Sequence, residues 1–201
     1  YRETLKNYHP DEYSKIMNEG LEQKEIQSVI QSYIDMLEKD GNYKDVLKFT
    51  SVVTDKDRYL AIKEVLAYYN TGDFDKTIES TSLLVEKNEN DIEALCLLGK
   101  AHMKKKEYKK SEEYFMKILQ IDMENMLGLK GLAKNLFLQG KYADSETYLQ
   151  IALKKEPENI TLLEGIGVAS GVQNKYSTAI EYFEKITELK PDYIGRWVNA
   201  G

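Results

Sequence analysis

The stretch that decides the fold is Asn70-Thr71-Gly72-Asp73-Phe74-Asp75-Lys76-Thr77-Ile78, together with its recurrence along the chain. A glycine commonly ends a helix, and an aspartate commonly caps the start of the next one. The aromatic residue of this turn recurs every 34 residues, as Phe74, Tyr108, Tyr142 and Tyr176. A fixed spacing of this size predicts a repeat architecture in which each repeat is one supersecondary motif.

The first third of the chain has a helical pattern of its own. Residues 1–20 predict a short helix beginning near His9-Pro10-Asp11, because proline and aspartate suit a first helical turn. Apolar residues in 21–39 then recur at helical spacing, which predicts an amphipathic helix that ends at Asp40-Gly41-Asn42. A second helix is predicted over residues 43–53. This pair is spaced 31 residues from the next turn and is interpreted as a degenerate, shortened repeat.

Four regular units follow, over residues 58–91, 92–125, 126–159 and 160–193, and each predicts a helix A, a turn and a helix B. Asn90-Asp91, Glu158-Asn159 and Asp192 lie where the next helix should be capped. Small residues form two columns that let helices approach closely; they are Gly99, Ala133 and Gly167 on helix A, and Ser111, Ser145 and Ala179 on helix B. Tyr108, Tyr142 and Tyr176 form a packing column and are expected in the core.

These columns resemble the tetratricopeptide repeat (TPR) family. The resemblance covers residues 58–193 clearly and 27–57 weakly, and the first regular unit departs from it at Glu64. It implies an all-α fold, a right-handed α-solenoid of antiparallel helix pairs, the TPR superhelix. Residues 1–57 would hold N-terminal helices with one degenerate pair. Trp197, Ala200 and Gly201 match the start of a further helix A, so residues 194–201 are expected to begin a truncated repeat of a longer protein.

Composition argues against several classes of function. The net charge of −6 and the pI of about 5.2 oppose general binding of nucleic acid, which needs a basic surface. Cys96 is the only cysteine, and His9 and His102 are the only histidines, so no metal site, cofactor site or nucleophilic triad is expected. No apolar run approaches the roughly 20 residues of a membrane span. The chain is predicted not to be an enzyme, and a cytoplasmic location is the default assumption.

The resemblance also implies a binding surface, because helix A lines the concave groove of such arrays. Mapping inner positions gives a partner-binding groove of Tyr59, Ile62, Leu66, Tyr69, Cys96, Lys100, Met103, Lys104, Lys130, Lys134 and Phe137. The same mapping adds Asn70, Glu93, Leu127 and Leu138, and it adds Thr161, Glu164, Val168, Gly171 and Val172 from the fourth unit. Apolar residues and lysines together favour a peptide with apolar anchors and acidic residues.

Some members of the family clamp the C-terminal carboxylate of heat-shock chaperones with Lys, Asn and Arg. The two possible registers hold Ile62, Leu66, Leu97, Leu127 and Gly131, or Cys96, Lys100, Gly131, Thr161 and Gly165. Neither set supplies the clamp.

The leading prediction is a non-enzymatic interaction scaffold or adaptor that binds a protein or peptide. The alternative is the targeting or regulatory region of a larger enzyme, such as a glycosyltransferase or a signalling kinase. Self-association through exposed repeat ends is a third possibility.

Overall fold

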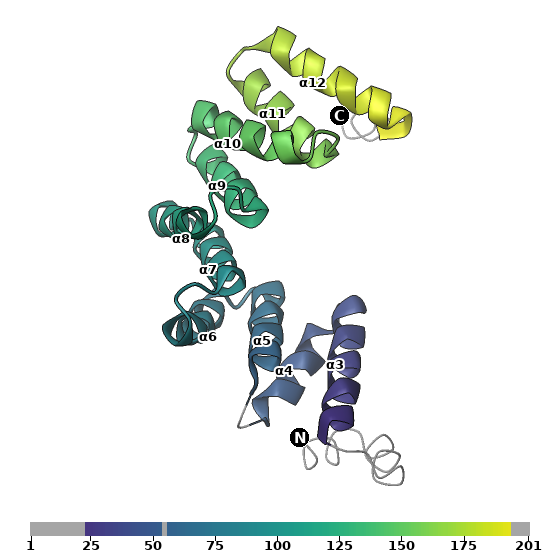
Figure 1. The fold of residues 1–201 in the computed structure, drawn as a ribbon, viewed down its shortest axis with the longest axis vertical. Coiled ribbons are helices and arrows are strands. Elements are labelled where there is room, and N and C mark those ends of the chain that lie inside the picture. The colour runs from purple at the N-terminus through teal and green to yellow at the C-terminus, as the bar shows by residue number, and fades with distance from the viewer. Residues whose placement is uncertain (1–22, 54–55, 194–201) are drawn as a thin grey trace. The chain divides into compact units, whose positions relative to one another are not determined.

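The computed structural model describes residues 23–53 and 56–193 (Figure 1). The helix predicted within residues 1–20 and the further repeat predicted at 194–201, with Trp197, lie outside these described residues. Within them every regular element is helical. The elements are α3 (Gln23–Lys39), α4 (Tyr43–Ser51), α5 (Arg58–Thr71), α6 (Phe74–Lys87), α7 (Ile92–Lys104), α8 (Tyr108–Ile121), α9 (Met126–Leu138), α10 (Tyr142–Lys155), α11 (Ile160–Val172), α12 (Tyr176–Leu189) and the 3₁₀ helix η1 (Pro191–Tyr193).

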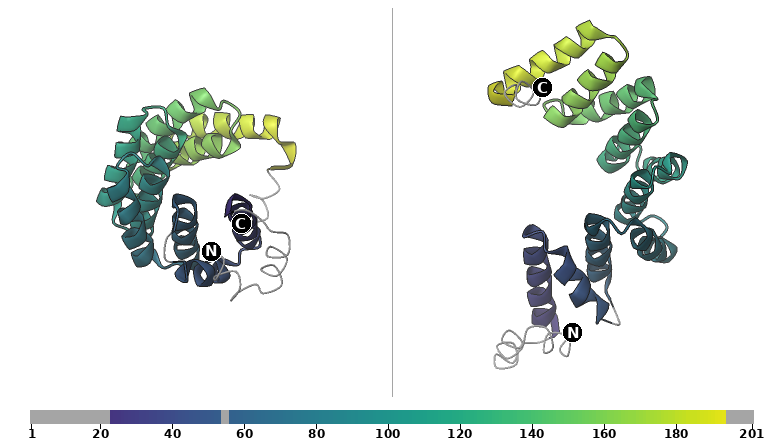
Figure 2. Two further views of the ribbon diagram at one scale, coloured as in Figure 1. Left: turned by 60° about the horizontal axis from the view of Figure 1, so that its bottom comes forward. Right: turned by 180° about the vertical axis from the view of Figure 1, so that it is seen from behind.

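The chain forms two compact units that divide within α7, the first ending at Leu97 and the second beginning at Leu98. In the first unit α3 packs on α4, α4 on α5 and α5 on α6. In the second, each helix from α8 to α12 packs against its neighbour in sequence (Figures 1 and 2). The fold is therefore an all-α solenoid of helix pairs. The predicted helices over 21–39 and 43–53 correspond to α3 and α4.

The start of every helix A from α5 onward is fixed by one column of capping residues. Asp57, Asp91, Asn125 and Asn159 are spaced 34 residues apart. The side-chain oxygen of each accepts a hydrogen bond from a backbone N–H in the first turn of the following helix, at 2.8 Å in α5 and 3.0 to 3.2 Å in the others. Such caps satisfy donors that the helix itself leaves unpaired. The sequence pattern predicted Asp91 and Asn159 as caps, and the structure adds Asp57 and Asn125.

The turns from helix A to helix B share one backbone conformation. Gly72, Lys106, Gly140 and Asn174 lie 34 residues apart, and all four have a positive φ, of 85°, 62°, 79° and 61°. Glycine and asparagine adopt this left-handed conformation most readily, whereas a lysine side chain makes it unfavourable. Lys106 is therefore the one residue of these four whose type disfavours the left-handed conformation.

The predicted columns of small residues bring helices A and B together. The Ser111 hydroxyl donates to the Gly99 carbonyl oxygen, and the Ser145 hydroxyl donates to that of Ala133, both at 2.8 Å. The ring of Phe115 is fully buried. A Cβ on Gly99 would lie 2.8 Å from this ring, and one on Gly131 would overlap it. The two glycines thus allow Phe115 to sit between α7 and α9.

The aromatic column is less buried than the sequence predicts, and the expectation for Tyr176 is wrong. Phe74 packs edge-on against Tyr69, with ring centroids 5.6 Å apart, and Tyr142 packs in the same way against Phe137 at 5.0 Å. Tyr176 is 63% exposed. The position that would cover it, 34 residues after Phe137, is Gly171, which has no side chain.

Glu64, the departure from the family pattern in the first regular unit, is buried but paired. Its two carboxylate oxygens lie 2.7 and 2.8 Å from the ammonium of Lys56, two residues before the start of α5. A buried carboxylate is costly unless a cation compensates it. Lys56 supplies that cation, so helix α5 packs normally despite the charged residue.

Candidate partner-binding site

A pocket of about 510 Å³ in the second unit is lined by residues of α9, α10 and α11. Its volume falls in the range typical of ligand and peptide sites. The lining residues are Lys130, Lys134, Phe137 and Leu138 of α9, Ser145 and Leu149 of α10, and Thr161, Leu162, Glu164, Gly165 and Val168 of α11. Of the groove predicted from the sequence, this pocket brings Lys130, Lys134 and Phe137 together.

Helical periodicity and one glycine create the pocket. Thr161, Glu164 and Val168 are spaced by three and four residues, so they share one face of α11. Gly165 lies on the same helix, and a Cβ there would be 3.0 Å from the Leu149 Cδ1 atom. The missing side chain lets α10 approach α11 and lets Leu149 form part of the pocket wall.

The pocket combines an apolar interior with positive charge on the α9 side. Phe137, Leu149 and Val168 are half-buried, so each retains surface that a partner could cover. Lys134 is exposed and forms no ion pair with the described residues. Lys130 is already engaged, because its ammonium lies 3.0 Å from Glu156 Oε2. Its hydrogen bond lowers the pKa of the Glu156 carboxyl, with a smaller contribution from Asn159.

The other predicted groove residues of the second compact unit, which begins at Leu98, lie on α7. Lys100 and Met103 are half-buried, and Lys104 is exposed. None of the three lines the α9–α11 pocket. Nearby, His102 is buried, with its Nδ1 atom 2.8 Å from Glu107 Oε2 and its ring stacked on Tyr114 at a centroid distance of 5.4 Å. These contacts give His102 a structural role.

In the first unit, the predicted groove residues differ in accessibility. Ile62 and Cys96 are buried, 4% and 3% exposed, so their side chains support the wall without forming its surface. Leu66 and Tyr69 are half-buried. Burial raises the pKa of the Tyr69 hydroxyl.

Tyr59, the fifth of these residues, is held by the preceding helix pair. Its hydroxyl oxygen lies 2.7 Å from Asp35 Oδ1 and 3.1 Å from the Gln31 carbonyl oxygen, both on α3. Burial, followed by the hydrogen bond to Asp35, raises the pKa of the Tyr59 hydroxyl well above its usual value. The polar end of Tyr59 is therefore occupied within the molecule.

Four pocket residues were absent from the predicted groove: Ser145, Leu149, Leu162 and Gly165. Ser145 and Leu149 belong to helix B, whereas the mapping considered inner positions of helix A alone. Gly165 could have been recognised from the sequence, because it lies 34 residues after Gly131 and both glycines stand inside a predicted helix A.

Potential metal ligands and the polarity of the helices also bear on the kind of site. Among the described residues, no group of three or more His, Cys, Asp and Glu side chains could hold a metal ion. Within that same part of the chain, each helix is too short or too polar to cross a membrane.

Comparison with solved structures finds the same fold. The structure titled MamA 41-end from Desulfovibrio magneticus RS-1 matches with a TM-score of 0.70 and 16% identity, over 83% of this chain and 96% of that one. A crystal structure of MamA protein matches at 0.67 and 17%, over 86% and 96%. The structure titled MamA MSR-1 C2 matches at 0.64 and 20%, over 81% and 98%. No curated protein gives a significant sequence match.

Two family models, both described as tetratricopeptide repeat, match the sequence directly. One covers residues 92–125 and the other residues 131–194. The first coincides with α7 and α8, and the second begins in α9 and continues beyond α12. The capping column, the left-handed turns and the small-residue columns recur with the same period of 34 residues. Residues 92–125 and 131–194 are therefore tetratricopeptide repeats.

Proposed function

We propose that this protein is a non-enzymatic interaction scaffold whose inner face binds an extended peptide or partner segment containing acidic and apolar residues. The α9–α11 pocket is the observation that carries the proposal. In this proposal the array comprises four units, 58–91, 92–125, 126–159 and 160–193, after a degenerate pair within residues 1–57. The alternative, a targeting region of a larger enzyme, stays a prediction.

The chemistry of the pocket favours a partner of this composition. Phe137, Leu149 and Val168 offer apolar surface, and burial of a partner's apolar side chain against them would provide most of the affinity. Lys134 carries a charge that no described residue neutralises, so it would attract a carboxylate and speed the encounter. A partner with apolar anchors beside acidic residues satisfies both parts of the pocket.

The proposal is tested with fluorescein-labelled peptides of about ten residues, the size of a short extended segment, in which Glu alternates with Leu and Phe. We expect Lys134→Glu to weaken binding about tenfold, and Val168→Asp to weaken it at least as much. Fluorescence anisotropy at low and high salt measures the affinity. Binding to the Lys134→Glu protein should also depend less on salt, because one attractive charge is lost.

Lys154→Glu is the matched control, since it makes the same change of charge at an exposed site of α10 outside the pocket. A second probe carries Lys in place of Glu and should bind poorly. Equal affinity of the wild-type, Lys134→Glu and Lys154→Glu proteins for the acidic peptide would reject the pocket as the binding site.

A further inference from the structure

The two ends of helix α8 carry opposite charge. Lys104, Lys105, Lys106, Lys109 and Lys110 cluster at its N-terminal end, on a chain whose net charge is −6. At its C-terminal end, the turn to α9 begins Asp122-Met123-Glu124. Because α8 has 14 residues, these ends lie on the order of 20 Å apart. One molecule therefore cannot bring its own acidic turn to its own lysine cluster.

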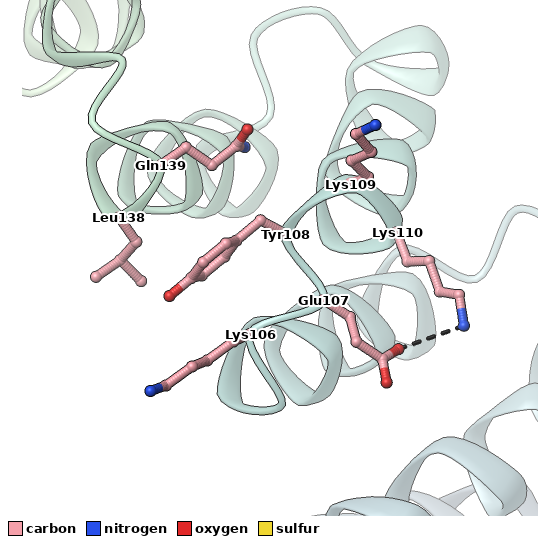
Figure 3. A pocket seen from close by; sticks show the side chains of 7 residues that line it. All are labelled: Lys106, Glu107, Tyr108, Lys109, Lys110, Leu138 and Gln139. Carbon is pink, nitrogen blue, oxygen red and sulfur yellow. Dashed lines mark ion pairs between the residues drawn. The ribbon is translucent and has the colours of Figure 1, made fainter.

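Three of these lysines, Lys106, Lys109 and Lys110, line a pocket of about 620 Å³, which we name the basic pocket (Figure 3). It is lined by Lys106, Glu107, Tyr108, Lys109, Lys110, Leu138 and Gln139. Figure 3 shows the Tyr108 ring extending between Leu138 and Lys106. Leu138 is 46% exposed, so an apolar surface lies beside the positive charges.

The only carboxylate of the basic pocket is already neutralised. The Glu107 carboxylate lies 3.3 Å from the Lys110 ammonium and 3.7 Å from that of Lys105, and it also contacts His102. Lys106 and Lys109 form no ion pair with any residue that the structure describes. An incoming acidic group would thus meet two uncompensated cations and no free anion.

The basic pocket is held by specific contacts. Asn135, which is fully buried, donates a hydrogen bond from Nδ2 to the Tyr108 carbonyl oxygen at 3.0 Å and so fixes the first turn of α8 against α9. Lys106 keeps the left-handed backbone of the turn, with φ of 62°, in place of the glycine or asparagine of the other repeats. Lysine is less favourable than glycine in this backbone conformation. Its presence here therefore indicates that the Lys106 side chain has a role other than folding.

The acidic turn at the other end of α8 presents an apolar tip. Met123 is 79% exposed, more than any other large apolar side chain among the described residues. Asp122 accepts a hydrogen bond from the Glu124 backbone N–H at 3.1 Å, which orders the turn. Lys155 pairs with Glu124 at 2.9 Å, and Asp122 has no ion pair within the described part. Met123 and Asp122 are therefore available to a partner.

We propose that the basic pocket of one molecule binds the Asp122-Met123-Glu124 turn of a second copy of this chain, so that copies associate head to tail. Met123 would lie against Tyr108 and Leu138, and Asp122 would face Lys106 and Lys109. The contact joins two different surfaces, so a bound pair of molecules retains one free pocket and one free turn. Association of this kind grows with concentration and does not stop at a dimer.

The charge complementarity between the two surfaces selects a second copy as the occupant. A single pocket buries less area than a stable interface, so we expect a Kd near 1 mM at low salt. Sedimentation velocity and light scattering on the whole chain, from about 10 µM to 1 mM, should show a weight-average mass that rises with concentration. The rise should shrink in high salt, because screening weakens exposed charge pairs.

Charge-reversed variants test the two surfaces separately. Lys106→Glu/Lys109→Glu makes both surfaces acidic, and Asp122→Lys makes both basic, so each variant alone should associate at least tenfold more weakly. An equimolar mixture should regain association, because each surface then meets its opposite. Lys87→Glu/Lys154→Glu is the charge-matched control and should associate as the wild type does.

Two further variants separate association from folding. Lys106→Gly should make the chain more stable and yet weaken association, and Met123→Ala should weaken association with no change of charge. Lys134→Glu, in the α9–α11 pocket, should leave association unchanged. A wild-type chain that stays monomeric at 1 mM overturns the proposal, even if an added acidic peptide binds the basic pocket. Association that survives Lys106→Glu/Lys109→Glu, or a mixture that does not recover, also overturns it.

Discussion

Lys106 has an unfavourable backbone conformation in an otherwise regular repeat. Its φ of 62° matches those of Gly72, Gly140 and Asn174 at the equivalent positions. A left-handed conformation costs a residue with a Cβ atom roughly 1–2 kcal/mol, of which the greater freedom of glycine in the unfolded chain offsets a part. The lysine side chain is thus retained at a measurable cost in stability.

Lys106→Gly is expected to raise the free energy of unfolding by about 0.5–1 kcal/mol, because glycine relieves the left-handed strain. Urea unfolding followed by circular dichroism measures the change. Gly140→Ala is the reciprocal control and should lower stability by about 1 kcal/mol, since it introduces a Cβ at φ of 79°. A Lys106→Gly protein less stable than the wild type would show that the side chain has stabilising contacts of its own.

At the scale of one element, Asp91 links two repeats of the first unit. It caps α7, and both of its carboxylate oxygens lie 2.8 Å from the Arg58 guanidinium at the start of α5. The hydrogen bond from Arg58 lowers the pKa of the Asp91 carboxyl, and the backbone N–H of Ala94 adds to this effect. A carboxyl with a lowered pKa in the folded state stabilises the fold only while it is ionised.

Asp91→Asn keeps the capping oxygen and removes the charge, so we expect it to cost about 1–2 kcal/mol at pH 7. The wild-type advantage should be complete above the unfolded pKa of about 4 and should disappear as the pH falls through the lower folded pKa. Urea titrations between pH 7 and pH 2.5 follow the difference. Asp40→Asn, in an exposed turn, should change little. A difference that stays constant down to pH 2.5 would contradict the role of the Asp91 charge.

At the scale of the whole molecule, the pairs of elements that pack most closely are neighbours in sequence. The stability of such an array is a sum of local terms, so damage to one unit should remain local. Gly131 offers a sharp test, because any Cβ at this position overlaps the buried ring of Phe115.

Gly131→Ala is expected to destabilise the second unit by about 1–3 kcal/mol through overpacking. Hydrogen exchange followed by mass spectrometry should show faster exchange in α8, α9 and α10 and little change in α3 and α4. Gly171→Ala is the control, because its Cβ would lie 3.9 Å from the nearest atom, the Ala179 Cβ, and should be tolerated. Equal acceleration of exchange throughout the described helices would contradict local stability.

The fold could be predicted from the sequence because its determinants are periodic. The turns, the small-residue columns and two of the four caps follow from residues 34 apart, and the structure confirms them. Tyr176 was misjudged because its burial depends on a second residue, Gly171, in the preceding helix. A column of aromatic residues predicts a packing position, but the neighbouring side chain decides how far the ring is covered.

The candidate site could be predicted only in part, for a similar reason. Helical phase predicts Lys130, Lys134 and Phe137 on the inner face, and all three line the α9–α11 pocket. It does not reveal that Leu149 of helix B reaches the pocket, because that contact depends on the missing side chain of Gly165. Nor does it reveal that α3 engages the Tyr59 hydroxyl, since the pair α3–α4 has an irregular spacing of 31 residues. Contacts between repeats, more than position within one repeat, determine which inner residues are accessible.

The capping column has a consequence for how such a gene could change in length. Duplication of the codons for residues 126–159 would place Asn159 directly before a second Met126, where Asn125 stands now. The new junction would therefore keep its helix cap. Gly131 of the inserted copy would face Leu149, a contact that Gly165 already accommodates. Unequal recombination could thus add a repeat in one step without a compensating point mutation.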